Sequence, residues 1–339
     1  MAAVSSTASP ERAPVRIVTA EWLKEHLEEV DLLEVAYRDI DGYEEGKFAP
    51  WPGIPGAKSV HPSVLEAGWD RKGYYPRYSE PLHGNILPPQ LLRELCLELG
   101  LPAPKSGKLV VVYGNHPAEE SLSAMAAGRV AWGLCAAGYD FEVAILDAGF
   151  HTWPSDLPRS DRVWFEPLGG WEAAAERWAQ KRQRAYEEIR AGGQPKLSQG
   201  WYPDNPYLAS TEDVLAAAGR SIVVDIRRED EHRTSQGSYY PFYDSSGHIP
   251  GSIWQGNWTN LVESHSLLGA LPSVVARWKA LGVLSPDGDP ETQAKLIFYC
   301  GTGWRSSLGF ILAGHLGLAA QNYDDGMYGW STAGHPVEH

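Results

Sequence analysis

The sequence has little cysteine, a shortage of positive charge and no long apolar run. Its 339 residues include only three cysteines, too few for a disulfide scaffold and typical of a reducing compartment. Lys and Arg number 29 against 43 Asp and Glu, a net charge of −14, which argues against nonspecific binding to nucleic acid or an anionic membrane. No apolar run approaches the roughly 20 residues that cross a bilayer. We expect an intracellular protein, in the cytoplasm or alternatively in a mitochondrion.

Patterns for metals, nucleotide cofactors and secretion are also missing. The eleven histidines are scattered, and no Cys or His pair has the spacing of metal ligands. No Gly-x-Gly-x-x-Gly or Walker pattern follows a predicted strand. The first sixteen residues hold no apolar core of a secretory signal and resemble an organelle transit peptide only weakly. We therefore expect no bound metal and no cofactor.

What the sequence does contain is one pattern that occurs twice. Four blocks recur in the same order: residues 30–35 and 221–226, 54–56 and 249–251, 109–113 and 296–299, and 146–153 and 323–330. The first and third are short apolar runs, the second is Ile-Pro-Gly in both copies, and the two copies of the fourth share an Asp, a Gly and a final Trp at matching positions. The repeat is too long for a solenoid, so it indicates a duplicated domain.

The duplication predicts an α/β fold with two similar domains. In each copy, apolar runs alternate with helical stretches at 89–99, 122–137 and 306–316, which is typical of a mostly parallel central sheet flanked by helices. We expect the first domain over residues 17–158 and the second over 206–335, with its first helix capped by Ser210 or Thr211. The linker, 159–205, is expected to carry an amphipathic helix over 171–191.

One segment has a strong chemical signature, the loop Cys300-Gly301-Thr302-Gly303-Trp304-Arg305. It joins a buried strand to an apolar helix, and such turns lie at the sheet edge where α/β proteins build active sites. The two glycines allow a tight turn whose N–H groups form a nest, and the helix N-terminus and Arg305 add positive charge. All of these favour a thiolate, so Cys300 is expected to be nucleophilic. Cys96 and Cys135 lie in apolar contexts and are expected to be core thiols.

These blocks and this loop resemble the tandem-domain rhodanese family of thiosulfate and 3-mercaptopyruvate sulfurtransferases, over roughly residues 17–158 and 205–335. The resemblance implies that Cys300 carries sulfur as a persulfide between a small-molecule donor and a thiol, cyanide or other small acceptor, in a ping-pong reaction. It also implies a catalytically silent first domain, whose counterpart of Cys300 falls at Tyr113 or Gly114. Arg227 and Arg233 match substrate-binding arginines of the family, and Asp225 is expected to orient neighbouring groups.

The donor stays open. Where mercaptopyruvate-specific members carry an Asp and a His, this sequence has His61 and Asn85. Upstream tyrosines, including Tyr240, and Tyr299 beside Cys300 resemble the polysulfide-dependent ergothioneine synthases, in which aromatic walls suit a quaternary ammonium group. Two further alternatives are a non-catalytic binding module and a phosphatase, although phosphatases place five residues between Cys and Arg and this loop has four. The oligomeric state also stays open.

Overall fold

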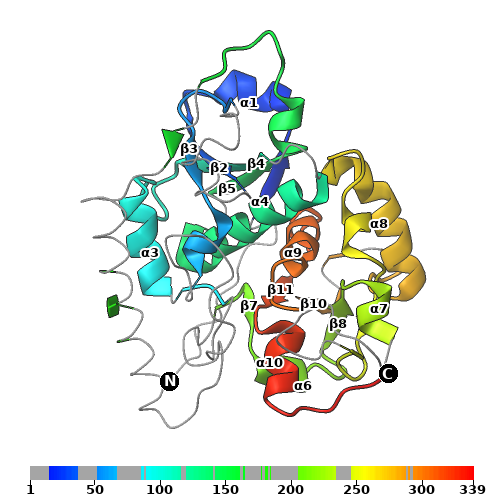
Figure 1. Ribbon diagram of the computed structural model, residues 1–339. Helices are drawn as coiled ribbons and strands as arrows, with labels where there is room; N and C mark the ends of the chain where they lie inside the picture. The colour runs from blue at the N-terminus through cyan, green and yellow to red at the C-terminus, as the bar shows by residue number, and fades with distance from the viewer. Residues whose placement is uncertain are drawn as a thin grey trace, which may run out of the picture.

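The computed structural model describes residues 15–36, 52–66, 85–87, 89–115, 120–139, 142–160, 163–164, 177, 180–181, 184, 205–233, 246–287, 289–290 and 293–339. These residues form two α/β units, each built on its own sheet (Figure 1). Every pairing between neighbouring strands is parallel. The predicted fold class, two parallel sheets flanked by helices, is confirmed.

The first sheet has six strands in the order β1-β5-β4-β2-β3-β6. They are β1 (Arg16–Val18), β2 (Val30–Val35), β3 (Lys58–Val60), β4 (Leu109–Gly114), β5 (Val143–Leu146) and β6 (Val163–Trp164). The central strands β2 and β4 are the apolar runs recognised in the sequence, and β4 is buried along its whole length, as expected of a strand covered on both faces. The sixth strand, β6, lies beyond residue 158, inside the segment that the sequence suggests as a linker.

The second sheet has five strands in the order β7-β11-β10-β8-β9. They are β7 (Leu208–Ala209), β8 (Ser221–Asp225), β9 (Ile253–Trp254), β10 (Lys295–Tyr299) and β11 (Ala320–Tyr323). Taken in chain order, the first five strands of the first sheet have the same arrangement, since β1, β5, β4, β2 and β3 correspond to β7, β11, β10, β8 and β9. The predicted duplication is therefore confirmed at the level of topology.

Among the described residues, the three helices predicted at 89–99, 122–137 and 306–316 are found close to those bounds. The α-helices are α1 (Ala20–His26), α3 (Pro89–Glu98), α4 (Glu120–Leu134), α6 (Thr211–Leu215), α7 (Glu229–Arg233), α8 (Leu267–Leu281), α9 (Ser306–His315) and α10 (Gly326–Thr332). Short turns of other helix types are η1 (Pro62–Leu65), η2 (Cys135–Tyr139), η3 (Gly149–Thr152) and η5 (Trp258–Leu261). Of the two caps predicted for α6, the structure has Ser210, which forms a capping box with Asp213. No helix in the described part of the chain is long and apolar enough to span a membrane.

The two copies also share individual hydrogen bonds. Tyr113 at the end of β4 donates to Glu34 and accepts from the Ile54 amide, and Tyr299 at the end of β10 bonds Asp225 and the amide of Ile249 in the same way. These equivalent contacts tie each Ile-Pro-Gly turn to its sheet. The turns therefore serve the same structural purpose in both domains.

The domains meet along α4 and α9, which lie side by side in Figure 1. Close approach depends on Gly128 of α4, because a Cβ there would lie 3.1 Å from Ser307 Oγ and 3.2 Å from the Leu308 side chain. Two equivalent aspartates cross this interface in opposite directions. Asp147 accepts from the Leu267 amide of the second domain at 2.7 Å, and Asp324 accepts from the Ile86 amide of the first at 2.8 Å.

Part of the sequence prediction falls on residues outside the described ranges. Of the expected helix over 171–191, residues 177, 180, 181 and 184 are described, and all four are helical. Arg177 and Lys181 form ion pairs with Glu98 and Glu94 of α3. The upstream tyrosines, including Tyr240, lie outside the described residues.

Candidate active site

Cys300 lies directly after β10, the central strand of the second sheet, and α9 begins at Ser306. The predicted turn from strand to helix is therefore found, with the cysteine at the carboxyl edge of the sheet. The side chain is fully buried. Its surroundings combine apolar groups of the core with the Ser306 hydroxyl, which donates to Cys300 Sγ at 3.5 Å. Beside it, Thr302 and Trp304 are half-buried.

The loop is held at both ends by its neighbours. The amides of Met327 and Tyr328, in the first turn of α10, donate to the carbonyls of Cys300 (2.8 Å) and Gly301 (3.0 Å). Asn322 Nδ2 of β11 donates to the Gly303 carbonyl at 2.9 Å. With the carbonyls bound in this way, the loop backbone has a fixed course.

The backbone N–H groups of this loop, in contrast, make no hydrogen bonds to the described residues. Within the part of the chain that the structure describes, the N–H groups of Gly301, Thr302 and Gly303 donate to no other group. Buried amides are nearly always paired, so three successive uncommitted donors beside a cysteine are suited to an anionic ligand. Gly303 has φ +75°, and a Cβ there would lie 2.3 Å from Asp324 Oδ1. Only glycine fits this position without displacing its neighbours.

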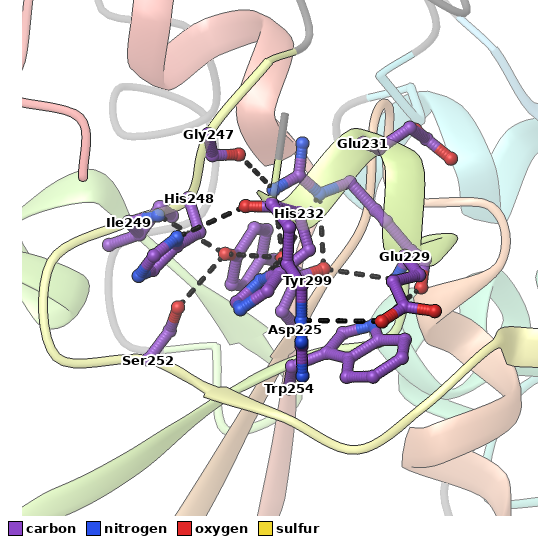
Figure 2. Close-up of polar contacts among 12 residues, drawn as sticks. Asp225, Glu229, Glu231, His232, Gly247, His248, Ile249, Ser252, Trp254 and Tyr299 are labelled. Carbon is purple, nitrogen blue, oxygen red and sulfur yellow. Dashed lines mark hydrogen bonds and ion pairs between the residues drawn. The ribbon is translucent and has the colours of Figure 1, made fainter. Parts of the chain in front are cut away.

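Asp225 lies at the centre of a buried network at the end of β8 (Figure 2). It accepts hydrogen bonds from Arg227 (2.8 Å to Nη2), His232 (2.9 Å) and Tyr299 (2.9 Å). Burial alone would raise the pKa of Asp225, but Arg227 and the hydrogen bonds hold that pKa well below its usual range. Arg227 is itself fully buried and donates to the Gly247 carbonyl at 2.6 Å. The structure thus gives Arg227 protein partners on this network, away from solvent.

Tyr299 and Cys300 are neighbours in sequence but lie in different cores. Alternate side chains of a strand point to opposite faces of the sheet, so Tyr299 packs in the cluster around Trp330, and Cys300 in the larger core that contains α9. The structure therefore does not bring Tyr299 to the sulfur, and its hydroxyl is used by Asp225.

The two remaining predicted arginines have separate locations. Arg305 is buried and forms a bidentate pair with Glu231 of α7, at 2.7 and 2.8 Å. Arg233 is exposed, pairs with Glu229 at 3.4 Å and lies over the Trp254 ring at 5.3 Å. Neither guanidinium is directed to Cys300 by these contacts.

The first domain has a glycine where the second has Cys300. The sheet pairs Glu34 with Tyr113 as it pairs Asp225 with Tyr299, so the residue that corresponds to Cys300 is Gly114. A Cβ at Gly114 would lie 2.2 Å from the backbone oxygen of Ser123 in α4. The packing of α4 therefore leaves no room for any side chain at this position.

Sequence reasoning missed a buried ionic cluster between the domains. Arg129 of α4 contacts Asp324 at 2.5 Å and Glu66 at 3.4 Å, and donates to the carbonyl of Gly303 in the Cys300 loop at 3.4 Å. Trp304 of the same loop donates its indole N–H to Glu66. A signal was present, since Arg129 is the one charged residue after Glu120 in a helix that is otherwise mostly small and apolar, and such a charge needs buried partners.

Burial has the largest effect on the pKa values of the two carboxyl groups in this cluster. It raises the pKa of Glu66 to about 8, although Arg129 opposes the shift. Burial also raises the pKa of Asp324 against the same opposing charge. Burial therefore favours the protonated form of both carboxyl groups, and the charge of Arg129 opposes it.

This shift makes a prediction for stability. The pKa of Glu66 is raised in the folded state, so the folded state binds the proton more tightly, and this stabilisation is lost as pH rises from 4.5 towards 8. We expect Glu66→Gln, which cannot ionise, to gain free energy of unfolding relative to wild type across this range. Denaturant unfolding at several pH values measures the difference. The control is Glu94→Gln, which changes an exposed ion pair with Lys181, and its difference from wild type in free energy of unfolding is expected to stay constant with pH. A difference for Glu66→Gln that also stays constant with pH would contradict the raised pKa of Glu66.

The sequence is related to known proteins along most of its length. Residues 210–333 match the rhodanese-like domain family. The chain is 27% identical over 292 residues to the thiosulfate sulfurtransferase YnjE of Escherichia coli, which covers 82% of this chain and 54% of YnjE. It is 25% identical over 342 residues to SseA of Mycobacterium tuberculosis, covering 97% and 92% of the two chains. The chain thus spans about half the length of YnjE.

Solved structures show the same fold. An EanB variant in complex with hercynine superposes with a TM-score of 0.66 at 21% identity, over 95% of this chain and 69% of EanB. The crystal structure of YnjE gives a TM-score of 0.63 at 22% identity, over 95% and 68%. Residues 210–333 are therefore a rhodanese-like domain, and the chain is homologous to the thiosulfate sulfurtransferases YnjE and SseA.

Proposed function

We propose that this chain is a sulfurtransferase that carries sulfur as a persulfide on Cys300. The observation that carries the proposal is the set of uncommitted amides of Gly301, Thr302 and Gly303 beside the cysteine, at the N-terminus of α9. These donors and the Ser306 hydroxyl suit an anionic sulfur. Homology to YnjE and SseA supports sulfur transfer in general.

The reaction has two half-reactions. The Cys300 thiolate attacks the outer sulfur of a donor such as thiosulfate, the donor's S–S bond breaks with its electron pair, and sulfite leaves. An acceptor such as cyanide or a thiol then attacks the terminal sulfur of the persulfide, and the Cys300 thiolate is released. No external oxidant or reductant is needed, because the sulfane sulfur is only passed on.

Access to the sulfur sets a condition on this chemistry. Cys300 is covered in the structure, and the half-buried Thr302 and Trp304 connect the loop to the surface. A donor has to displace part of this cover. The exposed Arg233 remains a candidate for attracting an anionic donor, and Tyr240 remains a candidate wall residue. We assign Asp225 and Arg227 to holding the end of β8 in place.

We further propose that the first domain does not carry sulfur, because Gly114 takes the place of the cysteine and α4 occupies the space of a side chain. Cys96 and Cys135 are buried and are not joined in a disulfide in the described part of the chain, which fits a reducing compartment, and we propose the cytoplasm. Burial raises the pKa of Cys96 to about 12, so this thiol is unsuited to nucleophilic work.

The half-reactions provide the test. Incubated with thiosulfate and no acceptor, the protein is expected to release one equivalent of sulfite per chain and then stop, and cyanide is expected to restore turnover. 3-Mercaptopyruvate and polysulfide are compared in parallel, with pyruvate release as the readout for the former. Absence of a stoichiometric first phase with every donor would contradict a persulfide carrier and favour a binding module.

A second candidate is sulfur insertion into a trimethylated histidine. The fold shared with EanB, which has been solved with hercynine and with ergothioneine, and the Tyr-Cys-Gly-Thr-Gly-Trp-Arg loop favour testing it. The experiment adds hercynine and polysulfide to the protein and looks for the thione product. Thione formation supports this candidate, and transfer to cyanide or a thiol without it supports the general sulfurtransferase.

A further inference from the structure

In the described part of the chain, one side chain is hydrogen-bonded to the sulfur of Cys300. Ser306, the first residue of α9, donates its hydroxyl to Cys300 Sγ at 3.5 Å, and both side chains are fully buried. The same hydroxyl makes no other hydrogen bond to the described residues. Ser306 is therefore in contact with the atom that makes and breaks bonds in the proposed reaction.

The usual partner of such a hydroxyl is occupied by other groups. In the first turn of a helix, a serine commonly donates to the backbone carbonyl three residues earlier. Ser307 does so, since its hydroxyl donates to the Trp304 carbonyl at 2.6 Å. The corresponding carbonyl for Ser306 is that of Gly303, which already accepts from side chains of β11 and α4, at 2.9 and 3.4 Å. A carbonyl oxygen has two lone pairs, so the Ser306 hydroxyl is left to the sulfur.

The backbone on which Ser306 lies is held from both sides of the loop. Arg305, directly before it, forms the bidentate pair with Glu231 of α7 at 2.7 and 2.8 Å. The carbonyl of Cys300 accepts from the Met327 amide of α10 at 2.8 Å. The hydroxyl and the sulfur are thus fixed relative to one another, and such a donor needs little reorganisation when charge develops on its acceptor.

The sulfur of Cys300 has opposite roles in the two half-reactions of the proposed function. In the first, Sγ attacks the donor and its negative charge passes to the terminal sulfur of the persulfide. In the second, the acceptor forms a bond to the terminal sulfur, the bond between that sulfur and Sγ breaks, and its electron pair stays on Sγ as a thiolate. A neutral sulfur is a weak hydrogen-bond acceptor and an ionised group a stronger one. The hydrogen bond from Ser306 therefore strengthens as the second reaction proceeds.

We propose that Ser306 is a catalytic residue that stabilises Cys300 Sγ as the leaving group when the persulfide passes its sulfur to the acceptor. The uncommitted amides of the loop serve the terminal sulfur instead. In thiol–disulfide exchange, a stabilised leaving thiolate departs faster. The same stabilisation increases the amount of attacking thiolate and lowers its reactivity, so its effects on the first half-reaction oppose each other. The inference rests on the proposed function and assigns Ser306 mainly to the second half-reaction.

The test measures the two half-reactions separately. Each protein is loaded with sulfur from thiosulfate, 3-mercaptopyruvate or polysulfide, whichever loads wild type, and is then freed of the donor. The loaded protein is mixed with cyanide, and thiocyanate formation is followed in a single turnover. Ser306→Ala is expected to slow this discharge by about 10-fold or more, the rate equivalent of one hydrogen bond to a charged group. The rate of loading is expected to change by less than about threefold, because the two effects on it oppose each other.

Ser307→Ala is the matched control. Ser307 follows Ser306 in the same helix and is also fully buried, but its hydroxyl binds a carbonyl and not the sulfur. Any effect of this variant passes through the backbone of the loop. We therefore expect it to change loading and discharge by the same factor, so that the ratio of the two rates stays that of wild type.

The outcomes for Ser306 and for the proposed function are distinct. An unchanged discharge rate in Ser306→Ala, or equal factors on loading and discharge, overturns the inference alone. If Ser306→Ala does not fold, Ser306→Gly, which also lacks the hydroxyl, takes its place with the same criteria. If wild type takes up no sulfur from any of the three donors, the proposed function fails and the inference fails with it.

Discussion

Replacing Asp225 by asparagine is expected to lower the free energy of unfolding by about 3–5 kcal/mol, the usual cost of leaving one member of a buried ion pair without its partner. Arg227 is fully buried and depends on Asp225 for its counter-charge. The same carboxylate holds His232 and the Tyr299 hydroxyl, so the variant also weakens the end of β10 that leads to Cys300. Denaturant unfolding measures the loss.

A matched control is Asp230→Asn. Asp230 also pairs with an arginine, Arg228, but both side chains are about half exposed, and such pairs contribute at most ~1 kcal/mol.

The pKa of Asp225 is lowered in the folded state, so the contribution of its carboxylate to stability is present above about pH 4 and is lost as pH falls below it. The difference in free energy of unfolding between wild type and Asp225→Asn is expected to become smaller below about pH 4. If Asp225→Asn and Asp230→Asn lose the same free energy of unfolding, or if the loss in Asp225→Asn does not depend on pH, the network around Asp225 is not what stabilises β8 and β10.

Replacing Gly303 by alanine is expected to reduce sulfur transfer by about 100-fold or more, because displacements of about 1 Å at a reacting group have costs of this size. A Cβ at this position would lie 2.3 Å from Asp324 Oδ1 and 2.9 Å from the backbone of the same residue. The loop has to shift to relieve the clash, and its amides shift with it. A steady-state transfer assay with cyanide as acceptor measures the effect.

Gly317→Ala provides the control, because Gly317 has nearly the same backbone conformation. Its φ is +76°, against +75° for Gly303, but a Cβ there meets nothing within 4 Å. Both variants share the strain of a left-handed alanine, about 1–2 kcal/mol, and only Gly303→Ala adds the clash. We expect Gly317→Ala to keep its transfer rate. Equal rates in the two variants would mean that the position of the loop does not control the chemistry.

The fold could be predicted from the sequence because its main signals are local and repeated. The apolar runs at 30–35 and 109–113 are central strands, and such strands are apolar on both faces. The cap at Ser210 follows from one side chain and the amide three residues on. The counterpart of Cys300 stayed open between Tyr113 and Gly114, because only the register of the sheet decides it.

The site could be predicted only in part. The strand, the glycine turn and the helix around Cys300 are contiguous, so their order in the sequence is their order in space. The ion pairs around the loop, in contrast, join residues that lie far apart in the sequence. Arg305 turns to Glu231, 74 residues away, and Asp324 meets Arg129 at a separation of 195 residues. The first pairing depends on the tertiary fold of the second domain and the second on how the two domains dock, and no local pattern contains that information.

The central claim is tested most directly by the intact mass of the protein after treatment with thiosulfate, 3-mercaptopyruvate or polysulfide. Wild type is expected to gain the mass of one sulfur atom with at least one donor and to lose it again on addition of cyanide. Cys300→Ser is expected to gain none, whereas Cys96→Ser, in which a buried core thiol is changed, should behave like wild type. An undiminished adduct in Cys300→Ser, or no adduct on wild type with any donor, would contradict the account.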